Sequence, residues 1–562
     1  MSVASASARQ GRPVIALAAR LATAAEQFAG WIGQLSGWQR AAAAFVAGAV
    51  SVLAMAPFFL SPVLFVTLPV VVWLVDASSG TSQRESALGA AAAGWWFGFG
   101  YFLFGLFWVG EAFLVEADKF AWLMPFAVVM LPAGMALYVA VALGAARLAW
   151  PRGIARVLVL ALALSATEWL RGHLFTGFPW NVLGYALTWP LSLMQSASVF
   201  GIYGLTLLCV PIFAGPLVIV AGAKPEARAG AVRNAVLLAV LPLLSLYAWG
   251  AWRLASEPPP PMIEGAHVRI VQPSIPQTDK WRPEKQRAIF EEHLTLSRQN
   301  AMGKRDDLAG VTHVIWPEAA MPFLPLEHPD ALAAIGDMLP EGTQLVAGAL
   351  RVKHPLTASE DGPREGYNSL MVFGDQGNLE EIYDKIHLVP FGEYLPMQAF
   401  LESLGLEQLS RWRGGFSIGP VPRPLLSVPG LPLVGGLICY EAIFPSAVVQ
   451  GGQRPGLLIN VTNDGWFGDT TGPWQHFHQT RVRAVEEGLP IIRAANNGVS
   501  AVVDAQGRVV AMLMLNARGV VDSGIPGSIE APIYAKFGDC TFVALALIFV
   551  GAAVVLNRRQ RD

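Results

Sequence analysis

The chain has 562 residues, of which 54% are hydrophobic and 14% are charged, and its formal net charge is −2. A soluble domain is about 45–50% apolar and about 25% charged, so this composition excludes a disordered chain, a collagen and a coiled coil. A near-zero net charge excludes a nucleic-acid-binding protein that depends on basic charge. Three cysteines are too few for a disulfide framework or a four-ligand zinc site. We expect no metal and no cofactor.

Charge is distributed unevenly along the chain. Only 16 of the 212 residues from Ala41 to Trp252 are charged, against 64 of the other 350. A spanning helix needs about 20 mostly apolar residues. Eight stretches approach that length and are predicted to span a membrane, namely 41–56, 58–75, 87–115, 120–146, 154–170, 191–223, 235–252 and 541–556.

Basic residues lie in alternate loops between these predicted spans. They are Arg9, Arg12, Arg20, Arg40, Arg84, Arg147, Arg152, Arg156, Lys224, Arg228, Arg233, Arg558, Arg559 and Arg561. The intervening loops hold only Lys119 and Arg171. Because positive charge accumulates on the cytoplasmic side, we expect both termini inside and residues 254–539 outside. The predicted setting is a bacterial inner membrane with a periplasmic domain, and a eukaryotic lumenal domain is the alternative.

The chain is therefore predicted to have five parts. They are a cytoplasmic lead-in at 1–40, a membrane domain of about seven helices at 41–254, a periplasmic domain at 262–530, a last span at 541–556 and a cytoplasmic tail at 557–562. The apolar run at 13–19 is too short for the core of a signal peptide, and many predicted spans follow it. The lead-in is therefore expected to stay uncleaved.

Ionisable residues near the predicted span ends have two interpretations. Glu111 and Glu168 lie close to such ends, and Arg171 follows Glu168 by one helical turn. Charges at membrane depth are costly and are often functional. We favour the simpler interpretation, which is an interfacial ion pair or a contact with lipid headgroups.

The region after four consecutive prolines at 258–261 changes character. Short β-branched runs predict strands at 267–275, 311–316, 344–350, 369–373, 433–438, 456–461 and 500–504, and helices are expected at 283–300 and 477–487. The turn at 504–507 indicates a hairpin. Alternating strands and helices with antiparallel additions predict a layered α/β domain.

Cys439 is the main candidate for a catalytic side chain. It stands at the end of an apolar strand and is followed by Tyr440 and Glu441, where a structural cysteine would be expected in an apolar environment. A strand-to-turn position exposes a thiol to a substrate, and a helix N-terminus would stabilise the thiolate. The alternative is a buried structural cysteine.

A nucleophilic cysteine needs a base, and the sequence offers two kinds. His387, His476 and His478 would allow a papain-type Cys–His pair. Glu318 follows Trp316 and Pro317 just past a predicted strand, where its carboxylate would be presented at a sheet edge. Lys385, among aromatic residues and prolines, could stabilise an oxyanion, or it could be an ordinary surface lysine.

The spacing of these three residues resembles the nitrilase superfamily. Lys385 follows Glu318 by 67 residues and Cys439 follows Lys385 by 54. The resemblance implies a four-layer αββα sandwich over about 267–521. It also implies that Glu318 is the general base, that Lys385 stabilises the tetrahedral oxyanion and that Cys439 is the nucleophile. Glu393 would be the second glutamate, which orients the lysine or the acyl carbonyl.

The whole chain resembles the apolipoprotein N-acyltransferase family, in which seven spans precede a nitrilase-like domain and one follows. The matching segments are Trp316–Glu318, Lys385–Glu393, Cys439–Glu441 and Asn463–Gly468, with Gln272, Pro273, Trp281, Tyr367 and Asn368. The implied fold is a multi-pass α-helical membrane domain joined to an α/β sandwich. Supporting site residues would be Glu393, Tyr440, Glu441, Trp281 and Asn368.

The resemblance also implies the reaction. An acyl chain would pass from a phospholipid, expected to be phosphatidylethanolamine, through a Cys439 thioester to the α-amino group of the diacylglyceryl-cysteine of an apolipoprotein. Lipid substrates would explain the spans. We expect an integral membrane monomer that binds no nucleic acid. The alternatives are a membrane-anchored nitrilase-type amidase and a transporter with an accessory periplasmic domain, and the absence of a charge ladder or repeat disfavours the transporter.

The segment 390–419 is unusually apolar for a region outside the membrane. We interpret it as a mobile arm that dips into the outer leaflet, with Gly414 and Gly415 as a hinge. The alternative is a helix packed onto the domain. The candidate arm residues are Phe391, Tyr394, Leu395, Trp412, Gly414 and Gly415.

Overall fold

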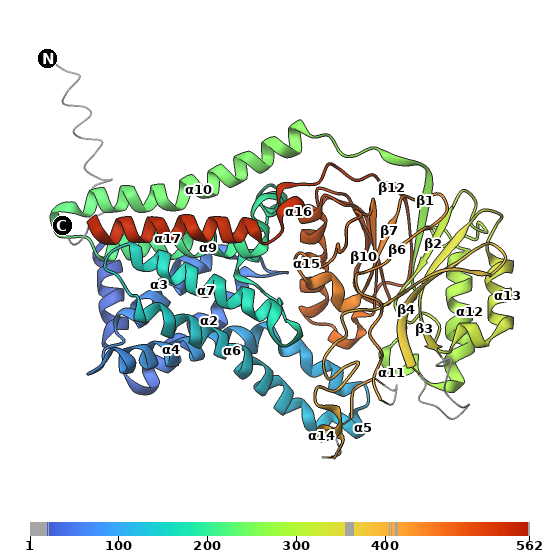
Figure 1. Cartoon of the computed structure of the whole chain (residues 1–562), viewed down its shortest axis with the longest axis horizontal. Coiled ribbons are helices and arrows are strands. Elements are labelled where there is room, and N and C mark those ends of the chain that lie inside the picture. The colour runs from blue at the N-terminus through green and yellow to red at the C-terminus, as the bar shows by residue number, and fades with distance from the viewer. Residues whose placement is uncertain are drawn as a thin grey trace. The chain divides into compact units, whose positions relative to one another are not determined.

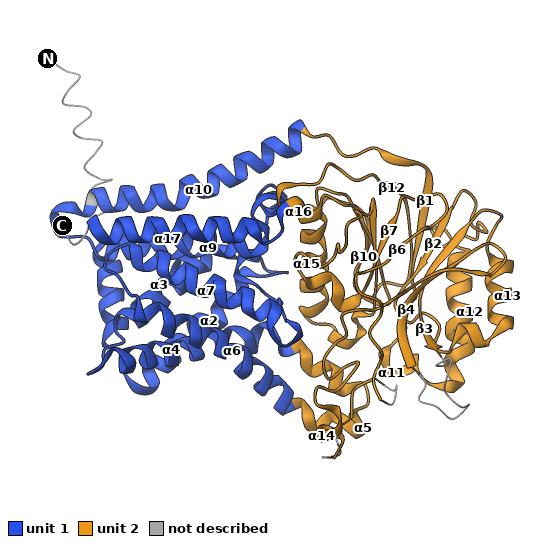
Figure 2. Cartoon of the chain, viewed as in Figure 1, with its two compact units in different colours: residues 1–107, 125–256, 537–562 blue, residues 108–124, 257–536 orange. Residues whose placement is uncertain are grey.

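The computed structural model describes residues 20, 22–353, 365–403, 405, 407–410 and 414–559. The chain divides into two compact units, coloured separately in Figure 2. The helical unit comprises residues 1–107, 125–256 and 537–562. The sandwich unit comprises residues 108–124 and 257–536.

The helical unit holds the apolar helices that the composition predicted (Figure 1). Within the described residues, six helices are long and apolar enough to cross a membrane. They include α4 (Gln83–Gly105), α6 (Met124–Leu148), α7 (Ala155–His173), α9 (Ala197–Ala221), α10 (Arg228–Ser256) and α17 (Cys540–Arg559). The first two predicted spans correspond to the shorter helices α2 (Gly37–Ser51) and α3 (Leu64–Asp76), and α8 (Leu191–Met194) precedes α9. A count of eight spans therefore stays a prediction.

The third predicted span, 87–115, ends ten residues earlier than expected. Helix α4 ends at Gly105, and a 3₁₀ segment, η3 (Phe107–Leu114), follows. The ring of Trp108 packs edge-on against Phe467 at a centroid distance of 4.6 Å, and its Nε1 donates to Gln475 Oε1 at 3.2 Å. These contacts make the segment part of the sandwich unit, which also contains α5 (Ala117–Phe120). Glu111 consequently lies beside Gly468 instead of at a helix end.

Glu168 and Arg171 form the expected ion pair, but it does not face lipid headgroups, because both side chains are buried inside the helical unit. Their exposed fractions are 7% and 1%, and Arg171 Nη2 lies 3.9 Å from Glu168 Oε1. Glu168 accepts hydrogen bonds from Leu183 N at 3.1 Å and from Thr206 Oγ1 at 3.1 Å. Arg171 donates to the carbonyls of residues 178 and 180. The pair therefore satisfies the backbone of an irregular segment among apolar helices, where unpaired polar groups are costly.

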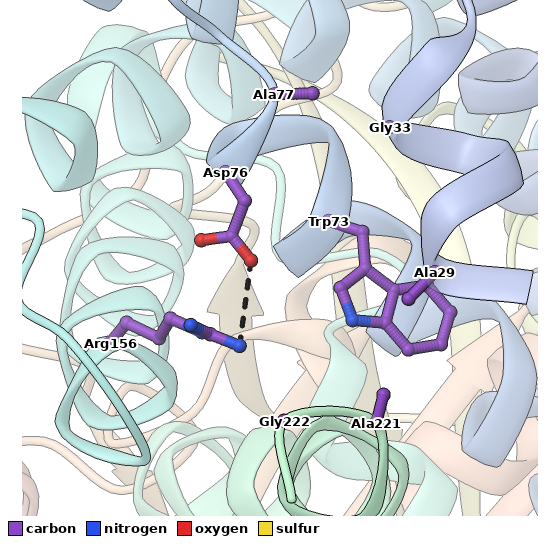
Figure 3. Close-up of a pocket in the computed structure, with 8 residues that line it drawn as sticks. All are labelled: Ala29, Gly33, Trp73, Asp76, Ala77, Arg156, Ala221 and Gly222. Atoms are coloured by element: carbon purple, nitrogen blue, oxygen red, sulfur yellow. Dashed lines mark ion pairs between the residues drawn. The ribbon is translucent and has the colours of Figure 1, made fainter. Parts of the chain in front are cut away.

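A cavity of about 340 Å³ opens within the helical unit (Figure 3). The indole of Trp73 forms one side, and opposite it Arg156 Nη2 faces Asp76 Oδ2 at 3.5 Å. Asp76 also accepts a hydrogen bond from Trp150 Nε1 at 2.7 Å. None of the predicted catalytic residues lines this cavity.

The sandwich unit is built on two six-stranded sheets. Their orders are β12-β1-β2-β3-β4-β5 and β11-β10-β9-β8-β7-β6. The central pairs are parallel in both sheets: β2 pairs with β1 and β3, and β8 pairs with β7 and β9. Antiparallel strands flank these pairs. The strands are β1 (Met262–Gln272), β2 (His313–Trp316), β3 (Gln344–Lys353), β4 (Glu365–Phe373), β5 (Leu379–Asp384), β6 (Leu425–Leu426), β7 (Val434–Ile438), β8 (Leu457–Thr462), β9 (Ile491–Ala495), β10 (Ser500–Val503), β11 (Val509–Leu513) and β12 (Gly519–Pro526).

Apolar side chains alternate between the layers, as the two-residue period of a strand requires. Ile315 of β2 and Ile438 of β7 point into one core between the two sheets. Val314 of β2 packs against α12 and α13, and Leu437 of β7 packs against α15 (Figure 1). The result is the αββα sandwich that the resemblance implied. The helices of the unit are α11 (Gln277–Lys280), α12 (Gln286–Ser297), α13 (Pro329–Met338), α14 (Gln398–Ser403), α15 (Gly472–Glu487) and α16 (Ile533–Phe537).

All seven predicted strands and both predicted helices of this unit are present, with ends that differ by a few residues. The hairpin at 504–507 is also present, because β10 and β11 pair antiparallel on either side of it. Five strands were not predicted, namely β5, β6, β9, β11 and β12.

Candidate active site

The three predicted catalytic residues stand at the ends of three strands. Glu318 follows β2 by two residues, Lys385 directly follows β5 and Cys439 directly follows β7. Glu318 and Lys385 come from one sheet and Cys439 from the other. Their exposed fractions are 7%, 1% and 7%. Lys385 lies 3.9 Å from Glu318, and the charges of both act on the Cys439 thiol, so the sandwich brings all three into one interior region.

A buried cluster of charges surrounds Lys385. Its Nζ lies 2.8 Å from Glu393 Oε2 and 3.9 Å from Glu318 Oε1. Asn368 Nδ2 bridges the two carboxylates, with hydrogen bonds of 2.8 Å to Glu318 Oε1 and 2.9 Å to Glu393 Oε1. Val389 N donates to Glu393 Oε2 at 2.8 Å. Each carboxylate is thus held in a fixed orientation on the lysine.

Glu318 has the environment of a base. Its Oε2 is buried, and within the described residues no hydrogen bond is made to it. Burial raises the pKa of Glu318, and the positive charge of Lys385 acts in the opposite direction. A glycine at position 348 of β3 allows the close approach, because a Cβ there would lie 2.5 Å from Glu318 Cα. The carboxylate therefore has one oxygen free to accept a proton.

Cys439 sits on a strained turn between β7 and η10 (Cys439–Ile443). Its φ is +51°, a left-handed conformation that non-glycine residues adopt rarely and that often marks an active site. Burial raises the pKa of the thiol, the negative charge of Glu318 raises it further, and Lys385 lowers it. A thiolate would therefore need both a base and a neighbouring cation.

The carboxylate of Glu441 holds the cysteine turn against the lysine loop. Its Oε2 accepts from Ile438 N at 2.7 Å, and its Oε1 accepts from Ile386 N at 3.0 Å and His387 N at 3.2 Å. Tyr383 also donates to Oε1 at 2.7 Å, and Arg423 Nη1 lies 3.2 Å from Oε2. Glu441 therefore fixes the two segments that carry Lys385 and Cys439 relative to each other.

The histidines occupy places that do not favour a papain-type pair. His476 Nε2 faces the carbonyl oxygen of Cys439 at 3.1 Å, and its Nδ1 faces Asp464 Oδ1 at 2.9 Å. His387 stacks on Phe444 at 3.7 Å, and His478 is buried on α15. Since both nitrogens of His476 face oxygen atoms, the geometry favours Glu318 as the base.

Comparison with known proteins shows the family to which the chain belongs. Residues 267–532 match the family described as carbon-nitrogen hydrolase, and residues 47–214 match the apolipoprotein N-acyltransferase N-terminal domain. The apolipoprotein N-acyltransferase of Rhodopseudomonas palustris is 47% identical over 93% of this chain and 96% of its own length. That of Brucella suis biovar 1 is 44% identical over 95% of this chain and 99% of its own length.

The chain belongs to the apolipoprotein N-acyltransferase family. The match covers the helical region as well as the sandwich, and it confirms the sequence-based prediction of an acyltransferase of this family. Among solved structures, an amidase from Nesterenkonia sp. AN1 is 17% identical over 46% of this chain and 93% of its own, with a TM-score of 0.31. A carbon-nitrogen hydrolase from Helicobacter pylori G27 is 14% identical over 46% and 89%, with a TM-score of 0.34.

The other residues predicted to support the site lie on several elements of the sandwich unit. Asn368 is 4% exposed on β4 and bridges the carboxylates as described. Tyr440 is buried in an aromatic cluster, 5.6 Å from the ring of His387 and 5.0 Å from that of Phe444. Trp281 directly follows α11 and is half-buried.

The predicted arm is partly apolar and exposed. Phe391 is 56% exposed with a φ of +63°, whereas Leu395 is 5% exposed. Tyr394 is half-buried, and its carbonyl accepts from Phe391 N at 2.7 Å. Gly414 and Gly415 have φ values of +87° and +76°, as a hinge would allow. Trp412 lies outside the described residues.

The sequence predicted no role for Lys280 and no partner for Asp464, and both are buried. Lys280, on α11, donates from Nζ to the carbonyl oxygen of Glu318 at 2.8 Å. Asp464 binds Arg493 Nη2 at 2.8 Å as well as His476, which forms a charged network behind the cysteine turn. The neighbouring motif residues Gln272, Trp281 and Asn463–Gly468 marked both regions, but no spacing rule linked Lys280 to Glu318 or Arg493 to Asp464.

Proposed function

We propose that this chain transfers an acyl chain from a membrane phospholipid to the N-terminal α-amino group of a diacylated apolipoprotein, through a thioester on Cys439. The observation that carries the proposal is the buried Glu318–Lys385–Cys439 cluster in a chain that matches apolipoprotein N-acyltransferases along nearly its whole length. The acyl donor is phosphatidylethanolamine, and the working unit is a monomer.

In the first half-reaction the Cys439 thiol attacks the ester carbonyl of the phospholipid. Its proton passes to Glu318, and the new C–S bond produces a tetrahedral oxyanion near the ammonium of Lys385. The intermediate collapses when the C–O bond of the ester breaks. The leaving alkoxide takes the proton from Glu318, which releases a lysophospholipid and leaves the acyl chain on sulfur.

In the second half-reaction the α-amino group of the lipoprotein cysteine attacks the thioester. Glu318 accepts the amine proton, Lys385 again stabilises the oxyanion, and the C–S bond breaks. The departing thiolate recovers its proton from Glu318, and the amide product leaves. The site is buried, and exclusion of water protects the thioester from hydrolysis.

The proposed setting is a bacterial inner membrane, with both termini in the cytoplasm and the sandwich unit in the periplasm. The support is the alternation of basic residues between predicted spans. Both substrates carry acyl chains in the bilayer, so a membrane-embedded enzyme can reach them where a soluble one could not.

The experiment uses the purified full chain, phosphatidylethanolamine with a labelled acyl chain, and a diacylated lipopeptide. We expect a hydroxylamine-sensitive label on the protein, its transfer to the lipopeptide, and no label on Cys439→Ala. Cys540→Ala, which removes an exposed free cysteine, is the matched control and should label normally. Wild-type acyl transfer by Cys439→Ala would overturn the proposal, and so would transfer without a labelled protein. Labelled phosphatidylglycerol offered in competition tests the headgroup.

A further inference from the structure

Lys280 is a buried cation beside the proposed base. It is the last residue of α11 and is 2% exposed. Its Nζ donates to the main-chain carbonyl of Glu318 at 2.8 Å. Within the described residues, no carboxylate oxygen lies within 4.0 Å of this ammonium. A lysine so placed is unusual, because buried charges are normally paired.

The charges of the neighbouring cluster explain why a second cation is tolerated there. Glu318 and Glu393 contribute two negative charges, and Lys385 contributes one positive charge. The cluster alone therefore carries a net charge of −1 in an interior where an excess charge is costly. One further ammonium makes the group neutral, and Lys280 supplies it.

We propose that Lys280 is a positioning residue of the acyl-transfer site, which holds the Glu318 main chain by its hydrogen bond and keeps the Glu318 carboxylate ionised by balancing the charge of the cluster. The proposal rests on the assignment of Glu318 as the base. It gives Lys280 a role distinct from that of Lys385, whose ammonium makes a direct ion pair with Glu393.

The groups that face Lys280 support its charged form at neutral pH. Burial lowers the pKa of Lys280 to about 8, while the charges of Glu318 and Cys439 raise it. His293, on the neighbouring α12, is also coupled to Lys280, and burial lowers the pKa of His293 to about 4. His293 is therefore neutral at pH 7, and Lys280 is mostly an ammonium. The positive charge of Lys280 lowers the pKa of Glu318, which is the titration that the test below follows.

The test measures how fast iodoacetamide alkylates Cys439 in the full chain between pH 5 and pH 9, in a Cys209→Ala, Cys540→Ala background. The rate should rise with pH as Glu318 ionises. We expect Lys280→Met and Lys280→Gln to move this rise upward by about one pH unit, because removal of a nearby positive charge makes ionisation harder. Lys280→Arg keeps the charge and should restore the wild-type midpoint to within about 0.3 units.

Two comparisons make the result specific. Lys285→Met removes a half-exposed lysine that pairs with Asp279 at 2.6 Å, and it should leave the pH profile unchanged. The Lys280→Gln variant can keep a hydrogen bond to the Glu318 carbonyl. If the midpoint of the alkylation profile shifts in Lys280→Gln as well as in Lys280→Met, the cause is the lost charge and not the lost hydrogen bond. Circular dichroism checks that each variant is folded.

An unchanged midpoint in folded Lys280→Gln would overturn the proposal, and so would a shift of equal size in Lys280→Arg. The alkylation readout needs no phospholipid. Failure of the acyl-transfer proposal would appear as a wild-type protein that forms no labelled adduct from phospholipid. The role of Lys280 is decided by the alkylation profile alone.

Discussion

The ammonium of Lys385 lies closer to Glu393 than to Glu318, at 2.8 Å against 3.9 Å. The shorter ion pair is thus made with the glutamate that orients the lysine, and not with the proposed base. This division leaves Glu318 Oε2 without a hydrogen bond among the described residues. The amide of Asn368 donates to both carboxylates, so a change in the position or charge of one glutamate alters the hydrogen bonding of the other.

Glu393→Gln should lower the rate of acyl-enzyme formation by about 100-fold, because the strongest ion pair of Lys385 is lost in a buried site. The negative charge of Glu393 raises the pKa of Glu318. Its removal should therefore move the pH profile of Cys439 alkylation to lower pH, which is the opposite of the shift expected for Lys280→Met.

The measurement is the same alkylation series, run beside labelled-phospholipid turnover. Glu402→Gln is the matched control, since Glu402 is exposed near the same segment and contacts Gln398. A shift of the alkylation profile toward higher pH in Glu393→Gln would contradict the charge argument.

Glu441→Gln should destabilise the sandwich unit, because the carboxylate accepts five hydrogen bonds, four from residues 383–387 and Ile438 and one from Arg423. Breaking a buried, paired charge costs about 3–5 kcal/mol. Burial opposes ionisation of Glu441, but Arg423 and the donors outweigh it, so the pKa of Glu441 is lowered. A carboxyl with a lowered folded-state pKa stabilises the protein above its ordinary pKa and loses that contribution as pH falls.

Thermal unfolding of the full chain from pH 7 to pH 3.5 checks this prediction. The Tm of Glu441→Gln should lie well below that of the wild type at pH 7, and the gap should narrow below about pH 4.5. Glu381→Gln, on an edge strand and only partly buried, is the control. A gap that widens as the pH falls would show that the charge of Glu441 is not the stabilising feature.

The sequence predicted Glu318, Lys385 and Cys439 as catalytic residues because each lies in a short distinctive motif, and Glu318 and Cys439 also follow strands with a clear apolar pattern. It missed four strands at the sheet edges, β5, β6, β11 and β12. Edge strands are half-solvated and carry polar residues, as in the Leu379–Asp384 run of β5, so their apolar pattern is weak. The fifth missed strand, β9, is central but contains Arg493, whose burial is explained by partners on other elements, Asp464, Asn460 and Thr480.

Long-range pairing also explains the other errors. Glu168 and Arg171 were expected at an interface because single charges near helix ends are usually solvated. In the structure they form hydrogen bonds with the backbone of residues 178–183, and no local sequence pattern predicts these contacts. Likewise Lys280 is an ordinary lysine by sequence, and its proposed role rests on its contact with Glu318, 38 residues later.

His476→Ala distinguishes the two candidate bases. In the structure the imidazole bridges Asp464 and the carbonyl of Cys439, so its loss should loosen the cysteine turn and slow alkylation by about tenfold. The midpoint of the alkylation profile should stay where Glu318 sets it. If His476 were the base, the alkylation rate of His476→Ala would no longer depend on pH. The alkylation rate of Glu318→Gln would then keep its pH dependence.

The exposed apolar side chains of the segment 390–419 should affect acyl transfer from phospholipid vesicles but not the reactivity of the Cys439 thiol. Phe391 and Phe400 are 56% and 58% exposed, and within the described part of this segment they are accompanied by exposed Met397 and Ile418. Transfer of a phenylalanine side chain out of water is worth about 1.5–3 kcal/mol. A double change, Phe391→Ser with Phe400→Ser, should therefore lower acyl transfer from phospholipid vesicles at least about tenfold.

Alkylation of Cys439 by iodoacetamide should be unaffected in this double variant, because a small soluble reagent does not depend on contact with the bilayer. Met302→Ser removes another exposed apolar side chain of the sandwich unit and is the matched control. Hydrogen exchange of residues 390–403 with and without vesicles gives an independent measure, with added protection expected from lipid in the wild type only. Equal vesicle activity in the double variant and the control would mean that the segment is packed onto the domain and does not act as a membrane-contacting arm.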